Sequence, residues 1–180
     1  SPPLQALLDA LCLLPAGTTA GTAGTLAGPA ASATDTQAML DELVAQSVLQ
    51  TRTGQDGQWR YVASEPVREY ACACRSADAA RALRRRLLDR LLHWARALPA
   101  TPPLPGVREE LPNLLVALGA ARDDGDANDA VRLVLWLQSS WGEISHSGEA
   151  LDALGRLLQA PGLDPSTAAG GHAVAAWSCF

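Results

Sequence analysis

The sequence predicts a mainly α-helical fold with one small β-hairpin. Over most of the chain leucines recur at three- and four-residue spacing, which is the spacing of one face of an α-helix. Two runs rich in Val, Thr, Trp and Tyr, 48–53 and 58–63, instead flank Gly54-Gln55-Asp56-Gly57, whose glycines can adopt positive φ without steric cost. No apolar run approaches the roughly 20 residues that cross a bilayer, so we expect no membrane contact.

Before the hairpin the leucine pattern predicts helices on either side of a weakly patterned segment. A first helix is expected up to Pro15, whereas residues 16–33 are small and predict a loop or a poorly formed second helix. Thr34, followed three residues later by Gln37, resembles a capping box for a helix over about 34–46.

After the hairpin, Ser64 is the expected cap of a further helix. That helix would extend over 66–75, with Pro66 in its first turn. A lone hairpin is marginal in water, so Trp59 and Tyr61 are expected to lie on the neighbouring helices. Helix, hairpin and helix in this order resemble a winged-helix arrangement.

The pattern beyond residue 76 is helical throughout. Expected helices span 78–98, 109–122, 127–141 and 148–159, the last capped by Ser147, and another begins at Asp164-Pro165. The helix over 127–141 is apolar on nearly all sides and should be buried between neighbours.

The spacing of these helices suggests a domain organisation. Helix starts near 127 and 165 are one helical hairpin apart, a spacing found in tetratricopeptide-type arrays. We therefore expect a winged-helix-like domain over 1–75 and a tetratricopeptide-like helical-hairpin arm over 76–180 that continues beyond residue 180.

Four segments carry a resemblance to a protein family. They are WRYVASEPVREYA, REELPNLLVAL, DDGDANDAVRLVLWLQSSW and SGEALDALGRLL, and together they lie within residues 36–160. Their order resembles bacterial transcriptional regulators built around a signal-transduction ATPase of the STAND class. The matching positions are Glu110, Asn113-Leu114, Gly125-Asp126-Ala127 and Trp141, whereas residues 16–33 depart from the family pattern.

This resemblance implies a regulatory fragment of a cytoplasmic protein. The fragment would be a winged-helix joint followed by the start of a sensory arm. Its partners would be the neighbouring ATPase domain of the same protein and an unknown effector or protein on the arm. ATP and Mg²⁺ would belong to the parent protein, and this fragment would need no cofactor.

The residues themselves argue against catalysis. A Walker A loop uses a lysine to reach the phosphates, and this chain contains none. Cys72 and Cys74 are two residues apart on an expected helix, so their side chains diverge and do not share a metal; we expect buried, structural thiols. No arrangement of Ser, His, Asp or Cys indicates a nucleophile, so we expect no enzyme activity.

Charge argues against nucleic acid as the partner. The formal net charge is -5, and the expected helix over 34–46 carries Asp35, Asp41 and Glu42 without a cation. Phosphate would repel this surface, so protein contacts are expected instead. The alternative is a DNA-binding winged helix with a helical dimerisation arm, in which Arg52 and Arg60 would contact the DNA backbone.

The arm contains a basic cluster and several candidate recognition residues. Arg81, Arg84, Arg85, Arg86 and Arg90 are expected on the face opposite Leu83 and Leu87, as a solvated surface. The candidates for partner binding are Trp136, Trp141, His146, Arg84 and Arg85.

Overall fold

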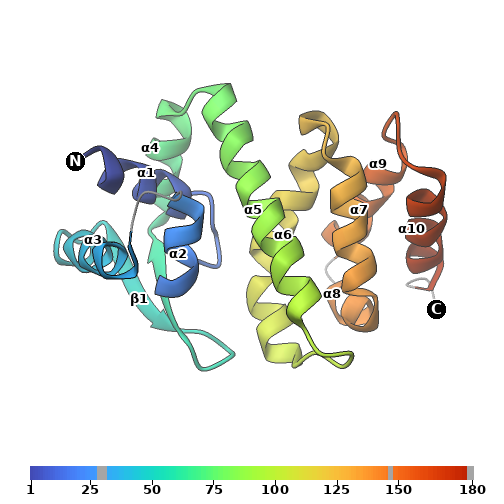
Figure 1. Ribbon diagram of the computed structural model, residues 1–180, viewed down its shortest axis with the longest axis horizontal. Coiled ribbons are helices and arrows are strands. Elements are labelled where there is room, and N and C mark those ends of the chain that lie inside the picture. The colour runs from blue at the N-terminus through green and yellow to red at the C-terminus, as the bar shows by residue number, and fades with distance from the viewer. Residues whose placement is uncertain (28–31, 146–147, 178–180) are drawn as a thin grey trace. The chain divides into compact units, whose positions relative to one another are not determined.

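The computed structural model describes residues 1–27, 32–145 and 148–177, and the chain separates into two units, Ser1–Leu83 and Arg84–Phe180 (Figure 1). Each unit is mainly helical, and the strands among the described residues form one antiparallel hairpin, which confirms the predicted fold class. The helix α5 (Ala77–Ala97) begins in the first unit and continues into the second. The division after residue 75 stays a prediction.

The first unit packs helices and a hairpin around one leucine-rich core. Its elements are α1 (Pro2–Leu11), α2 (Ala20–Ala27), α3 (Ala33–Ala45), β1 (Leu49–Thr53), β2 (Trp59–Ala63) and α4 (Glu65–Cys74). α1 packs on α2, α2 packs on α3, and the hairpin contacts all three helices. Residues 16–33, for which the sequence predicted a loop or a poorly formed helix, contain the helix α2. The helical alternative is therefore confirmed. The fully buried side chains at the centre include Leu7, Leu11, Leu40 and Leu49.

The start of α3 differs from the predicted capping box. Ser32 is the N-cap, because its Oγ accepts from the Asp35 amide at 3.1 Å and the Asp35 carboxylate accepts from the Ser32 amide at 3.3 Å. A capping residue needs extended backbone, which Ser32 has, whereas Thr34 already lies inside the helix. The box predicted at Thr34 and Gln37 is therefore wrong by two residues.

The hairpin is confirmed, with Leu49 opposite Ala63 and Thr53 opposite Trp59. Tyr61 lies on the helices as predicted, because its hydroxyl accepts a 2.8 Å hydrogen bond from Gln37 Nε2. The same expectation is wrong for Trp59, which is 66% exposed. Trp59 begins β2 beside the turn, at the end of the hairpin farthest from Leu49 and Ala63, which are buried. Ser64 precedes α4 at the predicted N-cap position, but its side chain makes no capping hydrogen bond.

The second unit is an array of helices. Beyond α5 its elements are α6 (Leu104–Asp124), α7 (Ala127–Trp136), η1 (Gln138–Ser140), α8 (Trp141–Ser145), α9 (Glu149–Leu158) and α10 (Pro165–Trp177). α7 packs against α6, α9 and α10 (Figure 1). The start of α10 at Pro165 is confirmed, and the predicted cap Ser147 lies outside the described residues. Assignment of this array to the tetratricopeptide class stays a prediction.

The single helix predicted over 127–141 is wrong, because α7 ends at Trp136. The Leu137 amide is shared between the carbonyls of Leu133 and Val134, at 3.2 and 3.0 Å, and this tightening leads into the 3₁₀ turn η1. The break also leaves Trp136 51% exposed, although burial was expected on nearly all sides of this segment. Leu133 and Leu137 are buried as expected.

Two glycines let α10 approach the rest of the array closely. A Cβ on Gly170 would lie 2.9 Å from Leu135 Cδ2, and one on Gly171 would lie 2.7 Å from Leu158 Cδ2. Larger side chains there would force α10 away from α7 and α9. None of the described helices combines the length and the apolar character needed to cross a membrane.

Candidate functional site

The solvent-facing side of α3 is acidic. Thr36, Leu40 and Leu43 are buried, and this packing leaves Asp35, Asp41 and Glu42 exposed. Asp41 accepts a 2.8 Å hydrogen bond from Gln37, and Glu42 accepts one of 3.1 Å from Gln46. The side-chain amides of Gln37 and Gln46 therefore fix the Asp41 and Glu42 carboxylates in place but leave their negative charge unneutralised. α3 itself contains no cationic residue.

Arg60 binds the turn of the hairpin, and Arg52 binds the segment between α1 and α2. Arg60 Nη2 pairs with Asp56 Oδ2 at 3.0 Å, and its side chain is only 4% exposed. Burial alone would raise the pKa of Asp56, but the Gln58 amide and the Arg60 guanidinium outweigh it and lower that pKa. Arg52 Nη2 donates to the Ala16 carbonyl at 2.8 Å. A phosphate could not reach Arg60 in this arrangement.

The first 79 residues match a family model described as a winged helix-turn-helix domain. The helices α2 and α3, followed by the hairpin and the β-bridge between Thr18 and Tyr61, supply the expected parts. The match and these elements together support a winged helix-turn-helix fold for residues 1–79. No curated protein and no solved structure matches the chain.

In a DNA-bound helix-turn-helix the second helix lies in the major groove, and here that helix is α3. Base edges and phosphates are read by Arg, Lys, Asn and Gln, supported by positive charge. The exposed face of α3 offers three carboxylates instead. The winged-helix part of the predicted resemblance is thus confirmed, while its ATPase context stays a prediction.

Two arginines of α5 in the second unit, Arg84 and Arg90, are bound to acidic residues of α6. Arg84 forms a bidentate pair with Asp124, and Arg90 Nη2 pairs with Glu110 Oε2 at 2.5 Å. The solvated surface expected for this cluster is therefore wrong for Arg84 and Arg90, because α6 brings carboxylates within reach. A partner-binding role for Arg84 would have to compete with this pairing.

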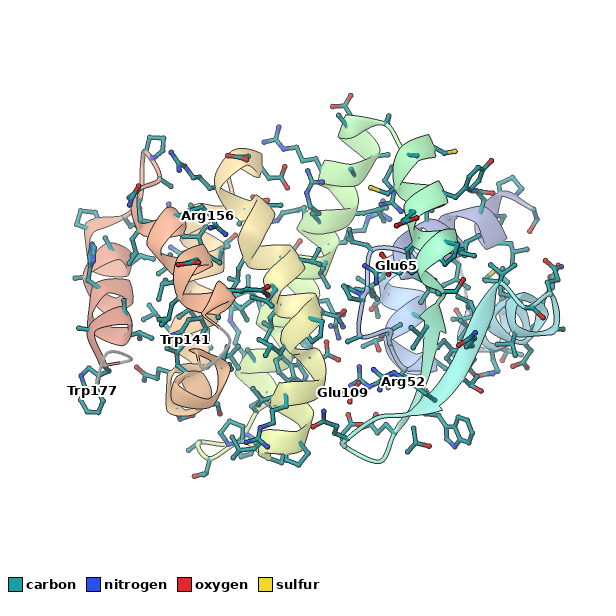
Figure 2. All side chains as sticks on the ribbon, turned by 180° about the vertical axis from the view of Figure 1, so that it is seen from behind. Arg52, Glu65, Glu109, Trp141, Arg156 and Trp177 are labelled. Atoms are coloured by element: carbon teal, nitrogen blue, oxygen red, sulfur yellow. The ribbon has the colours of Figure 1, made fainter. Side chains whose placement is uncertain are left out.

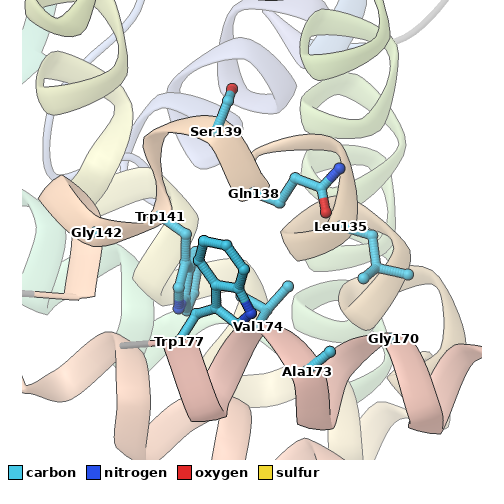
Figure 3. A pocket seen from close by; sticks show the side chains of 9 residues that line it. All are labelled: Leu135, Gln138, Ser139, Trp141, Gly142, Gly170, Ala173, Val174 and Trp177. Atoms are coloured by element: carbon cyan, nitrogen blue, oxygen red, sulfur yellow. The ribbon is translucent and has the colours of Figure 1, made fainter. Parts of the chain in front are cut away.

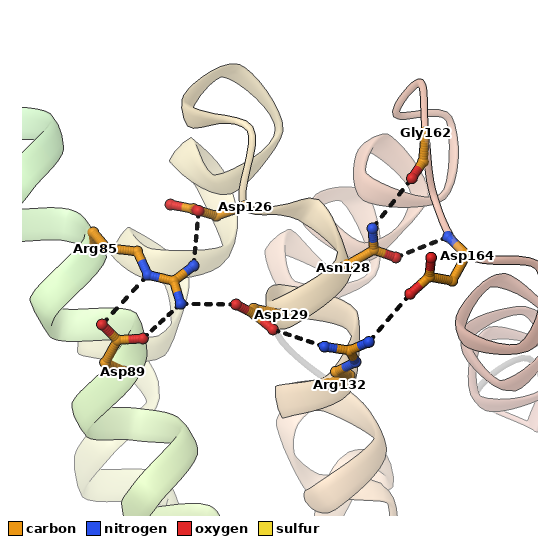
Figure 4. Close-up of polar contacts among 8 residues, drawn as sticks. All are labelled: Arg85, Asp89, Asp126, Asn128, Asp129, Arg132, Gly162 and Asp164. Atoms are coloured by element: carbon orange, nitrogen blue, oxygen red, sulfur yellow. Dashed lines mark hydrogen bonds and ion pairs between the residues drawn. The ribbon is translucent and has the colours of Figure 1, made fainter.

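Arg85 belongs to a larger polar network (Figure 4). Its guanidinium contacts Asp89, Asp126 and Asp129 at 2.7–2.8 Å. Burial would lower the pKa of Arg85, but these carboxylates outweigh it and raise that pKa, so the side chain stays charged. Arg132 extends the network from Asp129 to Asp164, at 3.1 Å for each pair.

The network continues through a neutral side chain. The Asn128 amide donates to the Gly162 carbonyl at 3.2 Å, and its oxygen accepts from the Asp164 amide at 2.8 Å (Figure 4). The start of α7 is thereby held both to α5 and to the loop before α10. This arrangement orients helices and leaves Arg85 only partly available to a partner.

The tryptophans of the second unit differ in exposure. Trp136 is half-exposed, and the Arg96 guanidinium lies over its ring at 5.9 Å, a cation–π contact. Trp141 is 2% exposed and lies among the helices, whereas Trp177 projects from the end of α10 and is 85% exposed (Figure 2). Sequence reasoning did not select Trp177. His146 lies outside the described residues.

The cysteines also differ from expectation. Cys72 and Cys74 are exposed rather than buried, because α4 turns Ala71 toward the core and leaves its neighbours in solvent. Cys12 is buried, and burial raises the pKa of its thiol to about 11. Within residues 1–27, 32–145 and 148–177, no three His, Cys, Asp or Glu side chains gather as a metal site.

Proposed function

We propose that this chain is a non-catalytic regulatory module whose winged helix-turn-helix domain binds a protein surface. The observation that carries the proposal is the exposed face of α3, with Asp35, Asp41 and Glu42 and no cation. DNA carries one negative charge per roughly 1.7 Å of axis, so this face would approach the duplex against electrostatic repulsion. A basic protein surface would be attracted to it instead.

The partner we propose is the neighbouring ATPase domain of the same cytoplasmic regulator, with ATP and Mg²⁺ bound by that domain. The helical arm would act as the sensor, and an effector bound there would change how the winged-helix joint holds the ATPase. The sequence resemblance supports this assignment. The polar network of the second unit also supports a sensor role. It connects α5 to α7 and to the loop before α10, so a displacement of one of these elements would displace the others.

A DNA-binding domain with a helical dimerisation arm is the second candidate. The family match favours it, since helix-turn-helix domains commonly read the major groove. It would need the cations Arg52 and Arg60 near phosphate. Arg60 is buried against Asp56, which leaves the wing with little free positive charge.

Fluorescence anisotropy with random duplex DNA at low salt separates the two candidates. We expect no saturable binding by the unaltered chain, and weak salt-sensitive binding by the double variant Asp41→Lys, Glu42→Lys. The double variant Glu149→Lys, Asp152→Lys, at exposed positions of α9, changes the net charge by the same amount and should not bind. Tight binding by the unaltered chain that Arg52→Ala weakens would support the DNA-binding candidate and refute the protein-contact proposal.

A further inference from the structure

The second unit contains a cavity of about 640 Å³ at the point where α7 gives way to η1 and α8 (Figure 3). One wall comes from Leu135, Gln138 and Trp141, and the other comes from Val174 and Trp177 of α10. Sites for small molecules usually have volumes of roughly 300–1,000 Å³. The cavity is therefore large enough for a compound with two or three fused rings.

The space exists because the backbone and two small residues leave it open. α7 stops at Trp136, so the chain turns away instead of filling the space with another helical turn. A Cβ on Gly142, which lines the cavity, would meet no atom within 4 Å. Ala173 lines the opposite wall with a single methyl group (Figure 3).

The lining selects an uncharged, flat ligand. No residue that lines the cavity is ionisable, so a charged ligand would lose its hydration without gaining an ion pair. Two indoles contribute to the walls, and flat aromatic faces favour stacking with another ring. Gln138 and Ser139 are exposed and can hydrogen-bond a polar substituent at the rim.

Two features of the tryptophans point to an occupant. Trp141 Nε1 is buried without a hydrogen-bond partner among the described residues, a state that costs stability until an acceptor reaches it. Trp177 is 85% exposed, although a large ring gains most when it is covered. A ligand with one acceptor could cover Trp177 and, after a small turn of the Trp141 indole, accept from its N–H.

We propose that this cavity binds an uncharged planar aromatic compound that carries a hydrogen-bonding substituent. This inference rests on the proposed role of the arm as a sensor, and it names the chemical class of the effector. Binding to the cavity can nevertheless be measured without the winged-helix domain's partner, so the two proposals fail separately.

The test uses the full 180-residue chain with 2-naphthol as the probe and 2-naphthoate as its charged counterpart. Isothermal titration calorimetry should detect 2-naphthol, and 2-naphthoate should bind at least about tenfold more weakly. Ala173→Phe should fill the cavity and weaken 2-naphthol binding by about tenfold or more. Ala176→Phe is the matched control, because Ala176 is exposed on the same helix and does not line the cavity.

Trp141→Phe tests the unpaired donor, since it keeps an aromatic ring and removes the N–H. We expect its 2-naphthol affinity to fall by several-fold while its circular dichroism spectrum stays unchanged. Equal affinity of Ala173→Phe and Ala176→Phe for 2-naphthol, or no binding by the unaltered chain, would overturn the proposal. So would a dimer in sedimentation that Ala173→Phe dissociates while 2-naphthol does not bind, because a second copy would then occupy the cavity. Cavity binding by a chain that also binds DNA tightly would leave this inference standing and refute the proposed protein-contact role.

Discussion

The Arg84 guanidinium binds the Asp124 carboxylate through two parallel hydrogen bonds, Nε to Oδ2 at 2.6 Å and Nη2 to Oδ1 at 2.7 Å. Asp124 is the last residue of α6, and Gly125 follows it with a left-handed φ of 85°. A carboxylate at a helix C-terminus opposes the helix dipole, so a cation is needed there. The pair therefore fixes α5 against the end of α6 and stabilises a charge that would otherwise be unfavourable.

Removing this pair should destabilise the second unit clearly. In Arg84→Ala, the Asp124 side chain, only 8% exposed, would lose this bidentate pair. We expect the free energy of unfolding to fall by about 2 kcal/mol, less than for a fully buried pair because Arg84 is 27% exposed. Urea unfolding followed by circular dichroism measures the change.

Arg132→Ala is the matched control for this prediction. Arg132 pairs with Asp129 and Asp164, but its side chain is 47% exposed and that of Asp164 is 50% exposed. Surface pairs contribute little, so the loss should stay within about 0.5 kcal/mol. Equal losses in the two variants would contradict a special role for the Arg84–Asp124 pair.

Gly17 should tolerate no side chain. Its φ is 67°, and a Cβ would lie 2.4 Å from the Tyr61 carbonyl oxygen and 2.6 Å from Val62 Cγ2. We expect Gly17→Ala to lower the free energy of unfolding by about 3 kcal/mol, because the segment between α1 and α2 that contains Gly17 must move away from β2. Chemical unfolding of the variant would measure the loss.

Gly57→Ala separates backbone strain from this clash. Gly57 has a similar φ of 76°, but a Cβ there would meet nothing within 4 Å. Only the left-handed conformation is then penalised, at about 1 kcal/mol. If Gly17→Ala and Gly57→Ala lower the free energy of unfolding equally, then close packing against β2 is not the reason that position 17 requires glycine.

The features that the sequence predicts well depend on neighbouring residues. Gly57 adopts the positive φ expected in the turn of the hairpin, whereas Gly54 does not, and Pro165 begins α10 where its missing N–H is not needed. The sequence predicts the N-cap of α3 at Thr34 instead of Ser32, because both side chains carry a hydroxyl that can accept the capping hydrogen bond. Only the backbone conformation at Ser32 distinguishes them.

The candidate sites depend on contacts between distant residues and could not be predicted in the same way. Arg84 and Asp124 are 40 positions apart, so the pattern that placed Arg84 on a polar face could not reveal its partner. Likewise, the cavity is lined by both Trp141 of α8 and Trp177 of α10. Whether a tryptophan is exposed depends on which neighbouring helix covers it. The spacing of apolar residues along one helix does not predict this.

The stability of the wing should depend on pH through Asp56. Burial alone would raise its pKa, but the Gln58 amide at 3.1 Å and Arg60 at 3.0 Å lower it below its ordinary value of 3.8. A pKa lowered by folding stabilises the folded state above 3.8, and this contribution is lost as the pH falls through the folded pKa.

Asp56→Asn tests this dependence, because it keeps an acceptor for Gln58 and removes the charge opposite Arg60. The variant should have a lower Tm than the unaltered chain near neutral pH, and the difference should shrink as the pH falls below 3.8. Thermal unfolding followed by circular dichroism across this range measures both proteins. A Tm difference that stays constant at all pH values would refute the role assigned to the Asp56 charge.

The thiols should react at very different rates. Burial raises the pKa of Cys12 from 9.0 to about 11, with Arg75 opposing the shift, whereas Cys72 and Cys74 are exposed. Only the thiolate attacks a disulfide reagent, so near neutral pH Cys12 should react about a hundredfold more slowly than an exposed thiol.

The measurement uses a Cys179→Ser background with Ellman's reagent, which should label two thiols quickly and the third only after urea is added. Cys12→Ala should leave the fast phase unchanged, and Cys72→Ala should halve it. Three thiols reacting at one rate in the folded protein would show that α1 and α4 do not enclose Cys12 in solution.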